Sequence, residues 1–289
     1  MAGNVTLTHA PRRRNWRRIA ERSAKRVLII AIILVSLAPG YWVIEASLQA
    51  QNSFFGSPLI PSSITLDNYV ALLRQTDFLL WVRNSLIVCL SGAAIATVIA
   101  ALAAFAFSRL RFTGRRHGLM AMLVVQMFPV SVALPAYYYI LLHLGLLNTF
   151  AGLVLVLAGG STAFITWVFK GYLDNIPHEL EEAAYVDGAT EFQALRRILL
   201  PLARPMLAVA FLLSFIGLYS EYILSSLILS STDLYTLPLG LRGFIYNEFA
   251  LHWTQFAAAA LVGSVPLLVI FLFMQRYLVS GLTRGALRG

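Results

Sequence analysis

Charged residues and cysteine are both scarce in this chain, and a nucleotide-binding loop is missing from it. Only 12% of its 289 residues are charged and 59% are hydrophobic, whereas soluble domains are about 25% charged and about 45–50% apolar. That imbalance excludes an ordinary soluble protein. The single cysteine, Cys89, excludes an intrachain disulfide and a cysteine-based metal site. The phosphate-binding pattern G-x-x-x-x-G-K-[ST] occurs nowhere, which excludes an ATP site of that type.

Catalytic and metal-binding patterns are missing as well. None of the five histidines stands at metal-ligand spacing from a cysteine or an acid, and no Ser-His-Asp arrangement indicates a membrane hydrolase. We therefore expect no catalytic residue, no metal site and no cofactor bound by this chain, and we predict that it is not an enzyme.

Six apolar segments are each long enough to cross a bilayer, which requires about 20 residues as a helix. We expect spans at about residues 27–47, 84–108, 118–142, 151–169, 206–230 and 257–275. Pro39 and Gly40 should interrupt the first span, and kinks are expected near Pro129 and Pro135 in the third. The predicted fold class is an all-α integral membrane protein with six transmembrane helices, in which residues 27–280 form one transmembrane domain.

Lys and Arg are distributed unevenly between the two sides that these spans define. Nineteen of the 22 fall on the side that contains both termini. Because Lys and Arg accumulate in cytoplasmic segments, both termini of this multi-pass protein are predicted to be cytoplasmic. Residues 1–26 form a basic arm suited to anionic membrane lipid. The net charge of +9 is thus explained by topology, and we expect no nucleic-acid partner.

A charged segment at residues 174–203 lies between the fourth and fifth spans, on the predicted cytoplasmic side. Glutamates near its start favour a helix N-terminus, and Asp187-Gly188 provides a turn that ends this helix. Thr190 with Gln193 fits a capping box for a second helix, which should stop before Pro201. The residues alone therefore predict a helical hairpin, which any long cytoplasmic loop could also form.

The spacing within this segment resembles the EAA motif of the membrane subunits of bacterial ABC importers. Glu182-Ala183-Ala184 is followed by Gly188 and then by the I-x-L-P pattern that ends at Pro201. The resemblance implies a type I ABC importer permease fold, whose cytoplasmic coupling helix docks on a separate ATPase chain that binds ATP and Mg. It also implies the residues for ATPase coupling: Glu182, Ala183, Ala184, Asp187, Gly188 and Pro201.

Further segments of the chain resemble the MalG-like permeases of maltose and maltodextrin importers, which lie in the bacterial inner membrane. These segments are 187–190, 199–201, 235–237 and 275–289. The resemblance implies a second, MalF-like permease subunit, two ATPase subunits and an extracytoplasmic sugar-binding protein as partners. A related ABC importer for another sugar or for glycerol phosphate stays open as the alternative.

Two peripheral segments acquire roles from the same resemblance. The loop at about residues 231–256, between the last two spans, is expected to reach toward the binding protein. Its candidate contacts are Tyr235, Tyr246, Asn247 and Glu248, and the alternative is a plain connector. The cytoplasmic C-terminal tail, residues 281–289, is expected to reach toward the ATPase subunits, and the alternative is that its arginines only anchor the last helix.

Glu221 is the one acidic residue deep inside a predicted span, since Glu45 lies within the last turn of the first span. Because an unpaired carboxylate is costly in a bilayer, Glu221 with Tyr219 and Ser220 is a candidate gate or path for the solute. The alternative is a polar cluster that packs the fifth span against its neighbour. A self-sufficient secondary transporter is the rival class of function, but it predicts paired charges within spans, and Glu221 has no such partner in the sequence.

Overall fold

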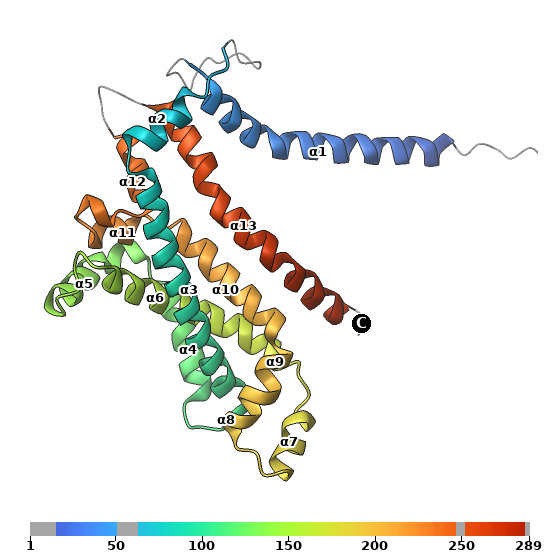
Figure 1. Cartoon of the computed structure of the whole chain (residues 1–289). Helices are drawn as coiled ribbons and strands as arrows, with labels where there is room; N and C mark the ends of the chain where they lie inside the picture. The colour runs from blue at the N-terminus through green and yellow to red at the C-terminus, as the bar shows by residue number, and fades with distance from the viewer. Residues whose placement is uncertain (1–15, 51–62, 247–251, 287–289) are drawn as a thin grey trace, which may run out of the picture.

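The fold is helical throughout the part of the chain that the structure describes. The structure is a computed structural model, and it describes residues 16–50, 63–246 and 252–286. Within these ranges the only strand-like pairing is an isolated antiparallel bridge between Gln49 and Ile64. Figure 1 shows the first helix, in blue, extending away from the other long helices, and short helices lying at both ends of the bundle.

The helices and helical turns are separated by connections of different lengths. In chain order they are α1 (Trp16–Leu48), α2 (Asp67–Gln75), α3 (Phe78–Arg109), α4 (Arg115–Gln126), α5 (Val130–His143), α6 (Phe150–Leu173), α7 (Glu179–Val186), α8 (Glu191–Ala194), η1 (Leu195–Leu199), α9 (Leu200–Leu202), α10 (Arg204–Tyr219), α11 (Ile223–Ile228), η2 (Thr232–Leu234), α12 (Leu237–Leu241), η3 (Arg242–Phe244) and α13 (Trp253–Ala286). Of the three η elements, η1 is a π-helical turn and the other two are 3-10 turns.

Four described helices are long and apolar enough to cross a membrane by themselves, namely α3, α6 and parts of α1 and α13. Two bent pairs would raise the number to six if each pair is one span: α4 with α5, bent by 101°, and the segment Glu191–Leu202 with α10, bent by 79°. The bend between α4 and α5 lies just before Pro129, whose backbone is extended (ψ 130°). A kink was expected there, whereas Pro135 lies within α5 without ending it.

The predicted first and fifth spans differ from the helices observed. α1 passes through Pro39 and Gly40 without a break, so the expected interruption is wrong. Pro is tolerated in such a helix where neighbouring groups satisfy the backbone. The expectation of one continuous helix over 206–230 is also wrong. α10 ends at Tyr219, and the separate short helix α11 begins at Ile223.

α3 is the central helix, and it packs closely because its contact face is built from small residues. It lies against α6 and α10 along its length and against α12 near its start (Figure 1). Ala93, Ala96, Ala100 and Ala104 are fully buried. Small side chains let neighbouring helices approach closely, which is how helices associate when lipid supplies no hydrophobic drive. One core cluster surrounds the first half of α3, and a second joins its last turns to α6, η1 and α10.

The alanine face of α3 generates a stability prediction. Replacing Ala100 by leucine should lower the melting temperature of the purified protein in detergent, because added methylenes in a packed core cost about 1–3 kcal/mol. Ala94→Leu is the matched control, since Ala94 lies exposed on the same helix and should tolerate the change. Equal melting temperatures for the two variants would show that α3 does not pack through this face.

Candidate functional site

The segment between α6 and α10 folds into the predicted hairpin. α7 ends at Val186, and Gly188 takes the left-handed conformation (φ 82°). Its amide donates to the carbonyl of Tyr185 at 3.0 Å, which closes the helix. The capping box is also confirmed: Thr190 Oγ1 accepts from the Gln193 amide at 3.3 Å, and Gln193 Oε1 accepts from the Thr190 amide at 2.9 Å.

Helical backbone continues past the predicted end of the second helix. α8 passes into the π-helical turn η1 and then into α9, so the chain stays helical as far as Leu202. Pro201 has no N–H to donate. It directly follows the π-helical turn η1, where the amide of Leu200 donates to the carbonyl of Leu195 and the hydrogen-bond register of the helix is shifted by one residue. The expectation that Pro201 stops this helix is therefore wrong, and the sharp bend comes at Ala203, before α10.

The hairpin presents an exposed face around the predicted coupling residues. Glu182, Ala183, Asp187 and Gly188 are exposed, and Ala184 is half-buried. Apolar side chains are exposed beside them, including Leu180, Val186 and Phe192. A cleft of about 320 Å³ opens between the two helices of the hairpin, lined in part by Ala184, Gly188, Gln193 and Arg197. Clustered exposed apolar side chains with a polar rim are typical of an interaction surface.

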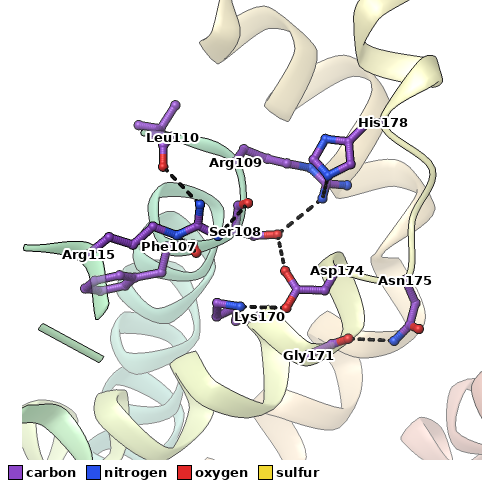
Figure 2. A network of polar contacts seen from close by, with 10 residues as sticks. All are labelled: Phe107, Ser108, Arg109, Leu110, Arg115, Lys170, Gly171, Asp174, Asn175 and His178. Atoms are coloured by element: carbon purple, nitrogen blue, oxygen red, sulfur yellow. Dashed lines mark hydrogen bonds and ion pairs between the residues drawn. The ribbon is translucent and has the colours of Figure 1, made fainter. Parts of the chain in front are cut away.

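The opposite face of α7 is fastened to α3 by a buried ion pair. Arg109 Nε lies 2.5 Å from Glu181 Oε1, and each side chain is only 3% exposed. Arg109 also donates to the carbonyl of Ile176 at 2.9 Å. It lies 3.2 Å from Nε2 of His178, and Figure 2 shows these two side chains next to each other. Adjacent glutamates of one helix thus have different environments, since Glu181 is buried and paired while Glu182 is exposed.

A second set of polar contacts joins the ends of α3 and α6 to the start of the hairpin. Ser108 Oγ donates to Asp174 Oδ1 at 2.7 Å, and Lys170 Nζ donates to Oδ2 at 2.6 Å (Figure 2). Burial alone would raise the pKa of Asp174, but the hydrogen bonds from Lys170 and Ser108 and the charges of Lys170 and Arg109 lower it. Asp174 therefore stays ionised at neutral pH and keeps both helix ends in place.

Comparisons with known proteins identify the kind of protein to which this hairpin belongs. Residues 96–284 match the family described as the binding-protein-dependent transport system inner membrane component. The chain belongs to this family. It is 36% identical over 263 residues to the maltodextrin transport system permease protein MdxG of Bacillus subtilis (strain 168), which covers 91% of this chain and 92% of the relative. It is 38% identical over 282 residues to the maltose/maltodextrin permease MalG of Escherichia coli (strain K12), which covers 91% and 94%.

Two further comparisons agree with this membership. The galactooligosaccharides transport system permease protein GanQ of B. subtilis (strain 168) is 36% identical over 266 residues, covering 91% of this chain and 94% of that one. A crystal structure of a bacterial ABC transporter that imports alginate superposes with a TM-score of 0.78 at 22% identity, covering 93% and 99% of the two chains. This chain is thus a permease subunit of an ABC importer and not an enzyme, and its fold is that of such permeases.

The residues considered for a gate form local structural contacts in this permease. Glu221 lies in the break after α10, where its carboxylate accepts from the amides of Leu224 and Ser225 at 2.6 and 3.0 Å. The hydroxyl of Tyr219 donates to the carbonyl of Gly263 at 2.7 Å, which ties α10 to α13. Ser220 donates to the carbonyl of Ile216. These contacts correspond to the packing alternative, while a role in the solute path stays a prediction.

Two of the four candidate contacts in the loop between the last two predicted spans lie within the described residues. Tyr235 is half-buried, and Tyr246 is 70% exposed. Asn247 and Glu248 lie outside the described residues. Among the described residues, no group of three His, Cys, Asp or Glu side chains could hold a metal ion.

Sequence reasoning missed Arg109 and Glu181, and their pairing can be tested. Glu181→Gln should strongly destabilise the permease, because removing one partner of a buried pair leaves the other charge uncompensated, at a cost of about 3–5 kcal/mol. Glu182→Gln is the matched control and should be nearly neutral. The measurement is the melting temperature in detergent, together with the rate at which a protease cleaves the hairpin. If both variants behaved alike, the buried pair would not hold α7 on α3.

Proposed function

We propose that this permease serves an ATP-driven importer of maltodextrin-type oligosaccharides and that α7 is the element through which a separate ATPase drives it. The observation that carries the proposal is that α7 has one face bound to α3 and another face exposed. Glu181 is fastened to α3, while Glu182 and Ala183 are exposed on another face of the helix beside apolar Leu180 and Val186. A force applied to the exposed face would therefore reach α3 through the ion pair.

The chemistry of α7 suits docking onto another protein. Ala183 and Ala184 have small side chains, which allow close approach of a partner backbone. Glu182 can pair with a basic group of the partner. Removing one side of such a pair at a partly buried interface costs a few kcal/mol of binding free energy. ATP and Mg would be bound by the partner ATPase, and this chain would bind no cofactor itself.

The family and the distribution of charges support a set of partners and an orientation for this permease. The assembly would contain two ATPase subunits, a second, MalF-like permease subunit and an extracytoplasmic sugar-binding protein. A related crystal structure contains the alginate transporter with a periplasmic protein that holds an alginate pentasaccharide. Arg109, Arg115 and Lys170 gather at the α7 end of the bundle, which supports placing this end and both termini in the cytoplasm.

The names of the relatives support an oligosaccharide substrate. The relatives are named as permeases for maltodextrin, maltose and galactooligosaccharides, which are all neutral sugars. Maltodextrin recurs most often among the similar relatives, so we take it as the substrate class. Family membership as an ABC importer subunit removes the rival hypothesis of a self-sufficient secondary transporter, whereas a related sugar or glycerol phosphate remains the competing substrate.

The test is co-purification of the permease with its ATPase after co-expression, followed by an ATPase assay with maltodextrin and the sugar-binding protein. Glu182→Lys should weaken ATPase association or abolish maltodextrin stimulation, because it reverses the charge of the docking face. Glu179→Lys is the control, since Glu179 is an exposed acid on the same helix. Wild-type coupling in Glu182→Lys would refute the role of α7. Stimulation by glycerol phosphate and not by maltodextrin would refute the substrate.

A further inference from the structure

We propose that the cleft at the end of α3 farthest from α7 is a saccharide-binding subsite of this permease, an inference that rests on the proposed function and deepens it. The cleft has a volume of about 460 Å³, within the range of small-molecule sites, about 300–1,000 Å³. It lies where the first turn of α3 meets the loop between α11 and α12 and the turn η3. The lining side chains that carry the argument are Asp77, Trp81, Thr232, Tyr235, Arg242 and Tyr246.

Buried hydrogen bonds hold the two sides of this cleft together. Asn84 is fully buried, and its amide donates to the carbonyls of Asp233 and Tyr235 at 2.8 and 3.0 Å. Ser85 Oγ, also buried, accepts from the amide of Leu237 at 2.7 Å. Both residues lie one turn beyond Trp81 on α3. The loop that contains Tyr235 is therefore fixed on the same rigid helix as Trp81, and the cleft is preformed.

Gly240 of α12 allows the indole of Trp81 to lie directly on the backbone. A Cβ atom added at Gly240 would lie only 2.1 Å from Cδ2 of Trp81 and 2.4 Å from its Cε3. The ring also meets Phe244 edge-on, with centroids 6.2 Å apart and an interplanar angle of 77°. Trp81 is nevertheless only half-buried. Its ring is thus locked in place while part of it borders the cleft.

The lining combines aromatic rings with groups that bind hydroxyls. Trp81, Tyr235 and Tyr246 supply ring faces, on which the apolar C–H faces of a sugar ring can pack. Arg242 lies with its guanidinium carbon 4.0 Å from the centroid of the Tyr246 ring, which positions its N–H donors at the cleft. Asp77 supplies a carboxylate acceptor, and it is exposed.

The balance of charges and the free polar atoms favour a neutral sugar. Asp77 and Arg242 contribute one negative and one positive charge, so the lining gives no preference for an anionic or cationic ligand. Within the described residues, no hydrogen bond occupies the carboxylate of Asp77 or the hydroxyls of Thr232 and Tyr235. A hydroxyl both donates and accepts, so a sugar with many hydroxyls can satisfy an acceptor, a donor and these hydroxyls together.

The cleft lies on the side from which an importer would receive its substrate. Trp81 precedes Arg109 by 28 residues in one continuous helix, which corresponds to about 42 Å at 1.5 Å per residue. That length exceeds the apolar thickness of a bilayer, about 30 Å. The cleft and the α7 hairpin therefore belong to opposite faces of the membrane. An oligosaccharide longer than a disaccharide could occupy this subsite with one end during transfer from the binding protein.

The first test is hydroxyl-radical footprinting of the complete transporter in nanodiscs under three conditions: without additions, with maltotetraose alone, and with the sugar-free binding protein alone. Maltotetraose should slow the oxidation of Trp81, Tyr235 and Tyr246. Tyr138, which is exposed on α5 and outside the cleft, should be oxidised at an unchanged rate. Unchanged oxidation of the cleft residues at saturating maltotetraose would overturn the proposal. Protection by the sugar-free binding protein, without protection by maltotetraose, would overturn it in favour of a protein contact.

The second test separates binding from transport rate. Asp77→Asn and Thr232→Val should each raise the KM for maltotetraose uptake by about tenfold, which corresponds to one lost hydrogen bond to a charged or well-placed group. The kcat for maltotetraose uptake should change little. Asp67→Asn is the control, because Asp67 is an exposed acid at the start of α2. If the KM of both cleft variants stayed equal to that of the unmodified transporter and of Asp67→Asn, the subsite would be overturned. If the unmodified transporter imports no oligosaccharide, the proposed function itself is wrong and the subsite falls with it.

Discussion

The position of the coupling hairpin depends on two opposite charges buried against each other, Arg109 at the end of α3 and Glu181 on α7. Removing such ions from water costs several kcal/mol each, and only close pairing offsets that cost. Neither partner can leave without exposing the other to an apolar environment. Under the proposed function, α7 and the end of α3 would therefore move together when an ATPase closes, while Glu182 remains available to the partner.

Local chemistry predicted the hairpin, whereas the long-range ion pair that fastens it to α3 could not be predicted. Gly188 and the capping box of Thr190 with Gln193 act within a few residues, so their sequence pattern determines their geometry. Glu181 and Glu182 are adjacent and chemically identical, and nothing local distinguishes them. The partner of Glu181 lies 72 residues earlier, so only the packing of α3 beside the hairpin decides which glutamate is buried.

Hydropathy located the apolar segments but not the breaks within them, because it reports the surroundings of side chains and not the path of the backbone. Pro129 marked the bend between α4 and α5, but no proline or glycine marks the break at Ser220–Tyr222. There Glu221 accepts the amides of Leu224 and Ser225, which satisfies donors that a membrane would leave without water. Glu221, an acid inside an apolar segment, therefore stabilises the break between α10 and α11.

α3 differs from α1, α5 and α13 in one respect, since those helices contain a proline and α3 does not. Sharp kinks in helices arise mostly at proline or at inserted groups, so α3 is expected to behave as a stiff rod. A rod about 42 Å long acts as a lever, and a tilt of about 5° at Arg109 would displace Trp81 by about 4 Å. The same helix that anchors α7 would then open or narrow the aromatic cleft at its other end.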